Sequence, residues 1–305
     1  MPPQTTGLSA SIMDRLKSLA RSNNQDFNLL LVRFANERLL YRLAQSPYAG
    51  QFTLKGAMLF ALWEDQPHRP TRDIDLLGFG EDSDEHMQAV FRDVCTHSVE
   101  PDGLVFEPES VSVSAIREGQ AYQGKRVEIS ALLGKARMRV QVDVGFGDAL
   151  AAPAEIIEFP TLLPLPAPRL LAYPAEAVIA EKVHAMATLG LINSRMKDLY
   201  DVHALSQQLV FEGALLVAAL EATFARRGTA PRAQLPQPLT EEFASNLGKI
   251  TQWNAFVSRS RLISQTLAQV VVSLEAFVAP PYLAFASSRP FRQRWTPPGP
   301  WRATS

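Results

Sequence analysis

Two aspartates separated by one residue are the first candidates for chemistry in this chain. Asp73 and Asp75 flank Ile74 in the segment DIDLLG. Side chains alternate along a β-strand, so both carboxylates would leave the same face, with Cα atoms roughly 7 Å apart. Two negative charges this close oppose each other's ionisation unless a cation lies between them. Mg²⁺ prefers oxygen ligands and often takes one or two carboxylates, so the pair predicts a metal site.

A candidate phosphate site lies upstream of this pair. An apolar strand from Thr53 leads into Lys55 and Gly56, and Ala57 opens a segment of helical length. The N–H groups at a helix N-terminus bind anions. Both motifs also have a purely structural interpretation. The aspartates could cap turns at the end of a sheet, and most glycines before a helix serve only a tight turn.

A third aspartate occupies a segment of alternating residues near the middle of the chain. Valines take every second position in 139–144, and Asp143 faces the other way. This alternation predicts a strand, and the turn residues Gly134 and Lys135 before it predict a hairpin with the preceding strand. If this strand lies beside the strand of Asp73, Asp143 completes a three-carboxylate site.

A lysine lies on the apolar face of a predicted helix in the second half of the chain. The helix is expected between Pro174 and Gly190, residue types that favour a helix start and a helix end. Lys182 falls between Val178 and Met186 on the face expected to be buried. It either extends its aliphatic stem along the surface to reach water or neutralises an anion.

The next predicted helix, 196–209, carries two aspartates one turn apart. Asp198 and Asp201 share one side of this helix, opposite an apolar side. They could serve the same site as the lysine, or they could simply pair with Arg195 and Lys197 on their own helix.

Length and composition limit the class of protein. The chain has 305 residues, of which 47% are hydrophobic, enough for two lobes with separate cores. A net charge of −1 excludes the strong overall field of a general nucleic-acid binder. The single cysteine, Cys95, excludes an intrachain disulfide, and the sequence shows no N-terminal signal segment and no uninterrupted apolar run of membrane-spanning length. We therefore expect a soluble protein of the cytoplasm with no membrane partner.

The candidate residues fall on both sides of a proline-rich stretch. Two helices are expected over 9–45, ahead of the strand at Thr53. Four prolines within 159–168 predict a linker between two lobes. The expected organisation is a first lobe over 1–160, a helical lobe over 161–279, and a basic, flexible tail over 280–305.

The order of these motifs resembles the AbiEii/AbiGii-type nucleotidyltransferase toxins, a branch of the polymerase-β-like nucleotidyltransferase superfamily. The motifs are LKGA, TRDID, VDV, EK and RMKDLYD, and the phrase RFANERLLYRLAQSPYAGQFTLKG is also typical. The resemblance runs from about Asn28 to about Leu209. It implies an α+β fold: a polymerase-β-like core with a small mixed sheet and flanking helices, plus a helical C-terminal lobe that completes the cleft.

The resemblance also implies an activity and partners. Family members act as toxins beside a cognate antitoxin encoded nearby. Characterised relatives transfer a nucleotide from an NTP to the 3′ acceptor end of tRNA and block translation. The implied metal is Mg²⁺, with two ions held by Asp73, Asp75 and Asp143.

Roles for individual residues follow from the same resemblance. Lys182 would neutralise triphosphate charge, and Asp198 would position that lysine or the base. The implied catalytic residues are Asp73, Asp75, Asp143, Lys182 and Asp198. The implied nucleotide-binding residues are Lys55, Gly56, Ala57, Thr71 and Lys182.

One departure from the family pattern concerns the phosphate turn. The family usually has Gly-Gly or Gly-Ser where this chain has Gly56 and Ala57. An alanine needs negative φ and offers no hydroxyl, so the triphosphate contact would differ. Two other functions stay open. The net charge near zero allows a nucleotidyltransferase for a small molecule or a protein hydroxyl, and Ala57 leaves open a catalytically weak relative that binds a nucleotide or a partner.

Overall fold

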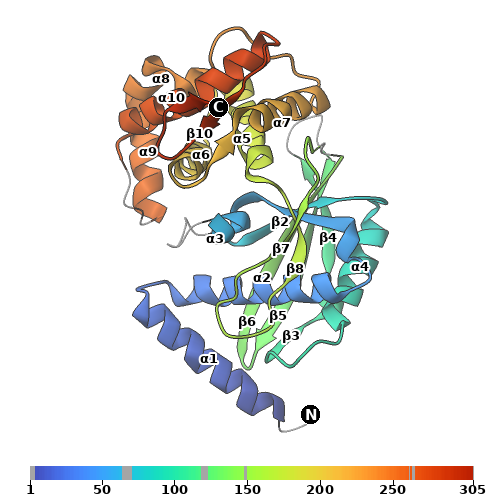
Figure 1. The fold of residues 1–305 in the computed structure, drawn as a ribbon. Coiled ribbons are helices and arrows are strands. Elements are labelled where there is room, and N and C mark those ends of the chain that lie inside the picture. The colour runs from blue at the N-terminus through green and yellow to red at the C-terminus, as the bar shows by residue number, and fades with distance from the viewer. Residues whose placement is uncertain are drawn as a thin grey trace. The chain divides into compact units, whose positions relative to one another are not determined.

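A computed structural model describes residues 4–63, 71–117, 123–147, 150–260, 262 and 265–304. Its contacts divide the chain into two compact units (Figure 1). The first takes most residues up to Ala172, and the second takes Tyr173–Ser305 together with Trp63 and residues 150–153. The α+β class predicted from the sequence is confirmed, because the first unit contains a mixed sheet and the second is mainly helical.

The first unit is built on an eight-stranded mixed sheet. Its path runs β3-β5-β6-β2-β1-β8-β7, with β4 paired to β5. The pairs β2 with β6 and β1 with β8 are parallel, and the other pairs are antiparallel. The strands are β1 Phe52–Lys55, β2 Asp73–Gly78, β3 Leu104–Phe106, β4 Ser112–Arg117, β5 Gln123–Leu133, β6 Ala136–Phe146, β7 Glu155–Glu158 and β8 Arg169–Ala172.

The unit boundary lies later than the one predicted at residue 160. The proline-rich stretch does not leave the first unit, because β8 follows it and pairs with β1. Backbone hydrogen bonding of this short strand to the sheet keeps 154–172 with the first unit.

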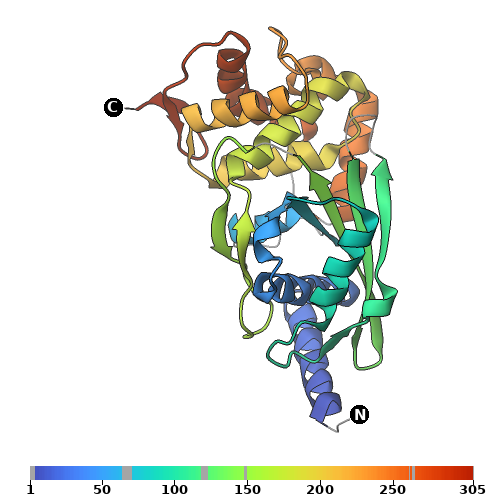
Figure 2. The ribbon, with the colours of Figure 1, turned by 90° about the vertical axis from the view of Figure 1, so that its right-hand side faces the viewer.

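Three helices accompany this sheet: α1 Gln4–Ser22, α2 Phe27–Gln45 and α4 Asp84–Thr96. Helices α2 and α4 cover one face of it, and α1 packs against α2. Asp26 caps α2 by accepting from the Leu29 N–H, and Ser83 caps α4 by accepting from His86, as N-terminal caps do. The sheet curls around α2 and α4, with α2 against β6 and β8 and α4 against β4 and β5 (Figure 2).

A buried ion cluster fixes α2 in this unit. Arg38 and Arg42 lie one turn apart and share one carboxylate: Arg38 Nε and Arg42 Nη1 are 3.0 and 2.6 Å from Asp102 Oδ2. Arg38 also donates to the Pro166 carbonyl at 2.7 Å, and its side chain has no exposed surface. The cluster therefore joins α2 to two loops that are distant in sequence.

Glu37, next to this cluster, is a buried acid. Its Oε2 accepts the Leu162 N–H at 2.8 Å, and Oε1 lies 3.7 Å from Arg38 Nη1. Burial raises the pKa of Glu37 to about 7, although the Leu162 hydrogen bond and the nearby Arg38 act in the opposite direction.

The second unit packs its helices around α10. The helices are α5 Ala175–Leu189, α6 Met196–Gln208, α7 Gly213–Arg226, α8 Glu241–Ser245, α9 Leu247–Ser260 and α10 Leu267–Ala286. A small sheet adds β9 Phe211–Glu212, β10 Gln293–Trp295 and β11 Trp301–Ala303, in the order β11-β10-β9.

Helix α10 is long and apolar enough to cross a membrane by length and composition alone. It has 20 residues with a mean hydropathy of 1.4 over its most apolar window. However, Val270, Leu274 and Phe277 are buried, and the helix contacts α6, α7 and α8 within its own unit. The core helix of a globular unit has the same composition, so this helix is weak evidence for a membrane span.

The C-terminal residues differ from the prediction of a flexible tail. Helix α10 continues through Pro280 and Pro281, and the residues after it form the β10–β11 hairpin. Trp295 is buried, and its Nε1 donates to the Ser206 carbonyl at 2.7 Å. The prolines, serines and arginines suggested disorder, but the aromatic residues between them supply the apolar area that a folded segment needs.

Candidate active site

A row of four charged residues crosses four neighbouring strands of the first unit. Lys55 on β1 lies opposite Asp75 on β2. Asp75 lies beside Asp143 on β6, which in turn lies opposite Arg126 on β5. Side chains at the same level of adjacent strands leave the same face of a sheet, so all four share one face. Each of the four residues is half-buried, so its charged group is still accessible to a dissolved ligand.

Asp73, the other predicted carboxylate on β2, lies on the same face. It is two residues before Asp75 along the strand and lies beside Gln141 of β6. Ile74 and Leu76 point to the opposite face and are buried in the core. β2 and β6 are therefore neighbours in the register that a site of Asp73, Asp75 and Asp143 requires.

The Asp143 carboxylate is already paired with an arginine side chain of the protein. Arg126 Nε and Nη2 donate to its two carboxylate oxygens at 2.9 and 2.8 Å, a bidentate pair. Gln141 Nε2 donates to the same oxygens at 3.2 and 3.3 Å. The hydrogen bond to Asp143 is the main cause of a raised pKa of Arg126, and the charges of Asp143, Asp73 and Glu128 raise it further.

These residues fit a divalent cation in donor type but not in present arrangement. Asp73 and Asp75 supply hard oxygen donors from one face of one strand, as Mg²⁺ prefers. Asp143 lies at the right level of the next strand, but Arg126 engages both of its oxygens. Within the part of the chain that the structure describes, no group of three or more His, Cys, Asp or Glu side chains is placed to hold a metal ion.

The turn after β1 is shaped by Asp75. Gly56 has φ +73°, a left-handed conformation that favours glycine. A Cβ at this position would lie 2.7 Å from both Cβ and Cγ of Asp75, too close for any side chain. The helix predicted from Ala57 is a 3₁₀ turn, Gly56–Leu59, followed by the four-residue helix α3, Phe60–Trp63. The absence of a side chain at Gly56 therefore makes room for the Asp75 carboxylate.

The start of β2 is held from two sides. Asn36 on α2, almost fully buried, donates from Nδ2 to the Arg72 carbonyl at 2.9 Å. The Thr71 hydroxyl donates to the Asp73 carbonyl at 3.5 Å, a long contact. Asn36 thus fixes the backbone immediately before the first aspartate.

The lysine and aspartates predicted in the second half of the chain form a cluster within the second unit. Lys182 Nζ on α5 donates to Asp198 Oδ1 at 3.0 Å and to Asp201 Oδ2 at 2.7 Å, both on α6. The two carboxylates have no exposed surface, whereas 13% of the lysine side chain is exposed. Arg195 Nε lies 2.7 Å from Asp198 Oδ2, so Asp198 pairs with the residue that precedes its own helix and with Lys182.

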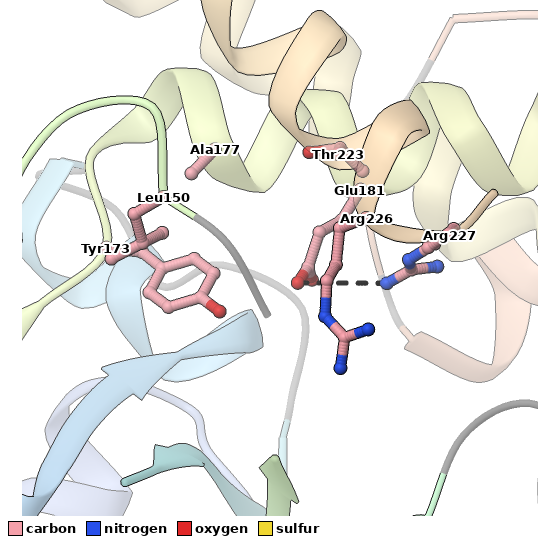
Figure 3. A pocket seen from close by; sticks show the side chains of 7 residues that line it. All are labelled: Leu150, Tyr173, Ala177, Glu181, Thr223, Arg226 and Arg227. Atoms are coloured by element: carbon pink, nitrogen blue, oxygen red, sulfur yellow. Dashed lines mark ion pairs between the residues drawn. The ribbon is translucent and has the colours of Figure 1, made fainter. Parts of the chain in front are cut away.

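A pocket next to this cluster lies entirely within the second unit (Figure 3). Glu181 Oε1 pairs with Arg227 Nη2 at 3.8 Å, and the ring of Tyr173 lies across the pocket. Burial and the neighbouring Arg227 lower the pKa of His184 to about 4, so this histidine is neutral at pH 7. The lining residues are Leu150, Tyr173, Ala177, Glu181, Thr223, Arg226 and Arg227.

The sequence comparison decides the family. The family described as nucleotidyl transferase AbiEii toxin, Type IV TA system, matches residues 38–271. The chain belongs to this family. As an AbiEii-family protein it is a nucleotidyltransferase of a toxin–antitoxin system, and the family implies an antitoxin as partner.

Two solved structures resemble this AbiEii-family chain at a low level. JHP933 from Helicobacter pylori has 14% identity and a TM-score of 0.44, covering 82% of this chain and 87% of its own. A candidate nucleotidyltransferase from H. pylori has 13% identity and a TM-score of 0.45, covering 83% and 94%. No curated protein matches the chain.

Two residues near the AbiEii-family carboxylates were missed by the sequence reasoning. Arg126 could have been found, because the two-residue turn at Gly134 and Lys135 fixes the hairpin register and places Arg126 opposite Asp143. Asn36 could not, since nothing local indicates that its amide reaches a residue thirty-six positions away.

Proposed function

We propose that this protein transfers a nucleoside monophosphate from an NTP to the 3′-hydroxyl of an RNA, specifically the acceptor end of tRNA, and so blocks translation. The observation that carries the proposal is the placement of Asp73, Asp75 and Asp143 at adjacent positions on one face of β2 and β6 in a chain of a nucleotidyltransferase family. A nucleotide attached to this end would occupy the hydroxyl that must carry the amino acid.

Asp73 and Asp75 are the proposed holders of Mg²⁺, with Asp143 as the third ligand of a two-ion site. Asp143 would join them by exchanging Arg126 for the metal, which its half-buried position permits. When bound, one ion lowers the pKa of the attacking hydroxyl and the other stabilises the departing pyrophosphate. The protein's own part is to keep the carboxylates in register before the metal arrives.

The triphosphate is assigned to cationic groups and backbone N–H groups. Lys55, next to Asp75 in register, and the turn at Gly56 and Ala57 are the proposed contacts near the carboxylates. The family resemblance proposes Lys182 as a further cation for triphosphate charge. Asp198 acts on Lys182 rather than on the nucleotide, because its buried carboxylate fixes the ammonium group. Thr71 serves as a minor nucleotide contact beside Asp73.

The partners and compartment follow from this proposal. An antitoxin encoded nearby would keep the enzyme inactive. The cytoplasm would be the site of action, because tRNA is aminoacylated and used there. The thiol of Cys95 is unreactive in this setting, since burial raises its pKa to about 12.

The test is incubation of the full chain with Mg²⁺, each labelled NTP and total tRNA. We expect label in tRNA with at least one NTP, none with EDTA, and a loss of about 10³-fold or more in Asp73→Asn and Asp75→Asn. Asp82→Asn, an exposed aspartate of the same unit, is the matched control and should keep full activity. The absence of label in RNA with every NTP would refute the proposal, and so would full activity of Asp73→Asn.

The same experiment separates the second candidate, transfer to a protein or small-molecule hydroxyl. Ala57 in the phosphate turn and the engagement of Asp143 by Arg126 are the features that favour an unusual substrate. Label that survives ribonuclease treatment and moves with protein or with small solutes would replace RNA as the acceptor.

A further inference from the structure

The C-terminal hairpin carries a set of arginines that the proposed active site does not use. Residues 272–305 follow the end of the family match at residue 271. No Asp or Glu occurs after Glu275, so this part of the chain has only positive side-chain charges. The hairpin formed by β10 and β11 lies within this segment, and β9 completes its sheet.

One face of this small sheet is fixed to the core by aromatic rings. Trp295 is fully buried and lies opposite Trp301 and Phe211 on the two neighbouring strands. The Phe277 ring stacks on Trp301, with centroids 5.7 Å apart and an interplanar angle of 4°. Trp301 Nε1 also donates to the Phe277 carbonyl at 2.8 Å. The sheet is therefore a rigid part of the second unit, and its other face is turned outward.

The outward face displays arginines at adjacent positions. Arg294 lies directly opposite Arg302 on β11, and Glu212 lies opposite Arg294 on β9. Arg292 is two residues before Arg294 and continues the pairing, because its carbonyl accepts the Thr304 N–H at 3.5 Å. All three arginines are exposed.

The positive charge of this face is only partly compensated. Arg294 Nε lies 3.3 Å from Glu212 Oε1, with both side chains about half exposed. Among the residues that the structure describes, Arg292 and Arg302 have no acidic partner within ion-pair distance. Like charges directly opposite each other destabilise an antiparallel pair. Because the rigid sheet keeps Arg294 and Arg302 opposite each other, an anion that binds both side chains would relieve their repulsion.

We propose that this arginine face, Arg292, Arg294 and Arg302, binds the phosphate backbone of an RNA. Neighbouring strands are about 5 Å apart and alternate residues of a strand about 7 Å apart, so successive guanidinium groups can follow successive phosphates. Guanidinium groups bind phosphate oxygens in a bidentate manner and stay charged at any physiological pH. The choice of RNA rests on the proposed function, in which an RNA is the acceptor.

The same face is poorly suited to a lipid surface. Membrane-surface binding combines basic residues with apolar side chains that enter the headgroup region. Between 287 and 304, none of the large apolar side chains that the structure describes is fully exposed, because the hairpin's aromatic rings face its own core.

The decisive experiment measures RNA binding independently of catalysis. Fluorescence anisotropy with labelled tRNA and the full chain, without NTP, is recorded over a series of salt concentrations. The variant Arg292→Gln/Arg294→Gln/Arg302→Gln should bind about tenfold more weakly at low salt, and the slope of log affinity against log salt should fall by about 2 to 3. Its thermal unfolding should stay unchanged or rise, because a repulsive pair is removed.

Two further variants separate local contacts from overall charge. Glu212→Gln removes the acid that pairs with Arg294 and should tighten RNA binding, the opposite sign to the arginine variants. Arg259→Gln, an exposed arginine of α9 in the same unit, should leave binding unchanged. An unchanged salt slope in the triple variant would overturn the proposal. A loss in Arg259→Gln as large as in the triple variant would do the same.

Failure of this inference and failure of the proposed function give different results. Full nucleotide transfer to tRNA with unchanged RNA binding in the triple variant leaves the function standing and removes the arginine face. Reduced binding in the triple variant with no transfer to RNA by the parent protein supports the face and removes the function. Binding of the parent to phosphatidylserine vesicles but not to RNA would assign the face to a membrane instead.

Discussion

Two ionic groups in the first unit are built from arginine and aspartate and differ in burial. We call them the buried set and the half-buried set. Arg38 and Arg42 enclose Asp102, and all three are buried. Arg126 holds Asp143 with 39% and 20% of the side chains exposed. The buried set can only be kept or lost with the fold, since an uncompensated charge in the interior is strongly unfavourable. The half-buried set can exchange one partner for another, which the proposed metal site would require.

The largest effect is expected in the buried set. Asp102→Ala leaves two buried guanidinium groups without their carboxylate and should lower the free energy of unfolding by about 3–5 kcal/mol. Urea denaturation followed by circular dichroism measures it. Asp93→Ala removes an exposed carboxylate that accepts from the Tyr48 hydroxyl and should change stability by less than about 1 kcal/mol. Equal losses in the two variants would remove the distinction between buried and exposed pairs.

The second effect concerns the contact between Gly56 and Asp75. Gly56→Ala places a methyl group against the carboxylate and requires a positive φ, so Asp75 must move. We expect nucleotide transfer to fall about 10²-fold, because misplacement of a reacting group by about 1 Å has this size of effect. Gly80→Ala, also at positive φ but with open space where the added Cβ would lie, is the matched control and should keep its activity. Comparable losses of activity in both variants would contradict a specific role for the contact.

The third effect concerns Glu37, the buried acid next to Arg38, and depends on pH. The pKa of Glu37 in the folded protein is about 7, above its unfolded value, so folding favours the protonated acid. This contribution is fully present below about pH 4.5 and is lost as the pH rises through about 7. Glu37→Gln should therefore be more stable than the parent at pH 8, by about 2–3 kcal/mol, and nearly equal to it at pH 5. Parallel stability–pH curves for the two proteins would refute the assignment.

The smallest effect belongs to the half-buried set. Arg126→Gln releases Asp143 and removes a positive charge that competes with a metal, so Mg²⁺ should bind several-fold more tightly. Isothermal titration with Mg²⁺, without NTP, measures this directly. Stability should change by less than about 1 kcal/mol, because the pair is partly exposed. An unchanged affinity for Mg²⁺ would show that Arg126 does not compete with a metal and has only a structural role.

Local patterns in the sequence predicted the parts of the site that depend on local geometry. The spacing of Asp73 and Asp75 and the alternation around Asp143 correctly predicted two strands with outward carboxylates, because strand periodicity needs no tertiary information. The helix bounds near Pro174 and Gly190 were also predictable from capping chemistry.

Long-range pairing could not be predicted in this way. Asp102 lies about sixty residues from the two arginines that it neutralises, and neither segment has a signal for the other. The C-terminal hairpin was missed for a different reason: arginines and prolines dominate its composition, while its apolar contacts come from a few aromatic residues, among them Trp295 and Trp301.

Trp295 has a consequence for the order of events during synthesis. Its indole donates to the Ser206 carbonyl in α6, the helix that carries Asp198 and Asp201. A ribosome adds residues from the N-terminus, so Trp295 emerges after helices α5 to α10 of the second unit. The core beneath α6 therefore stays open at one side until the β10–β11 hairpin has been synthesised, although the helices that carry Lys182, Asp198 and Asp201 are already present.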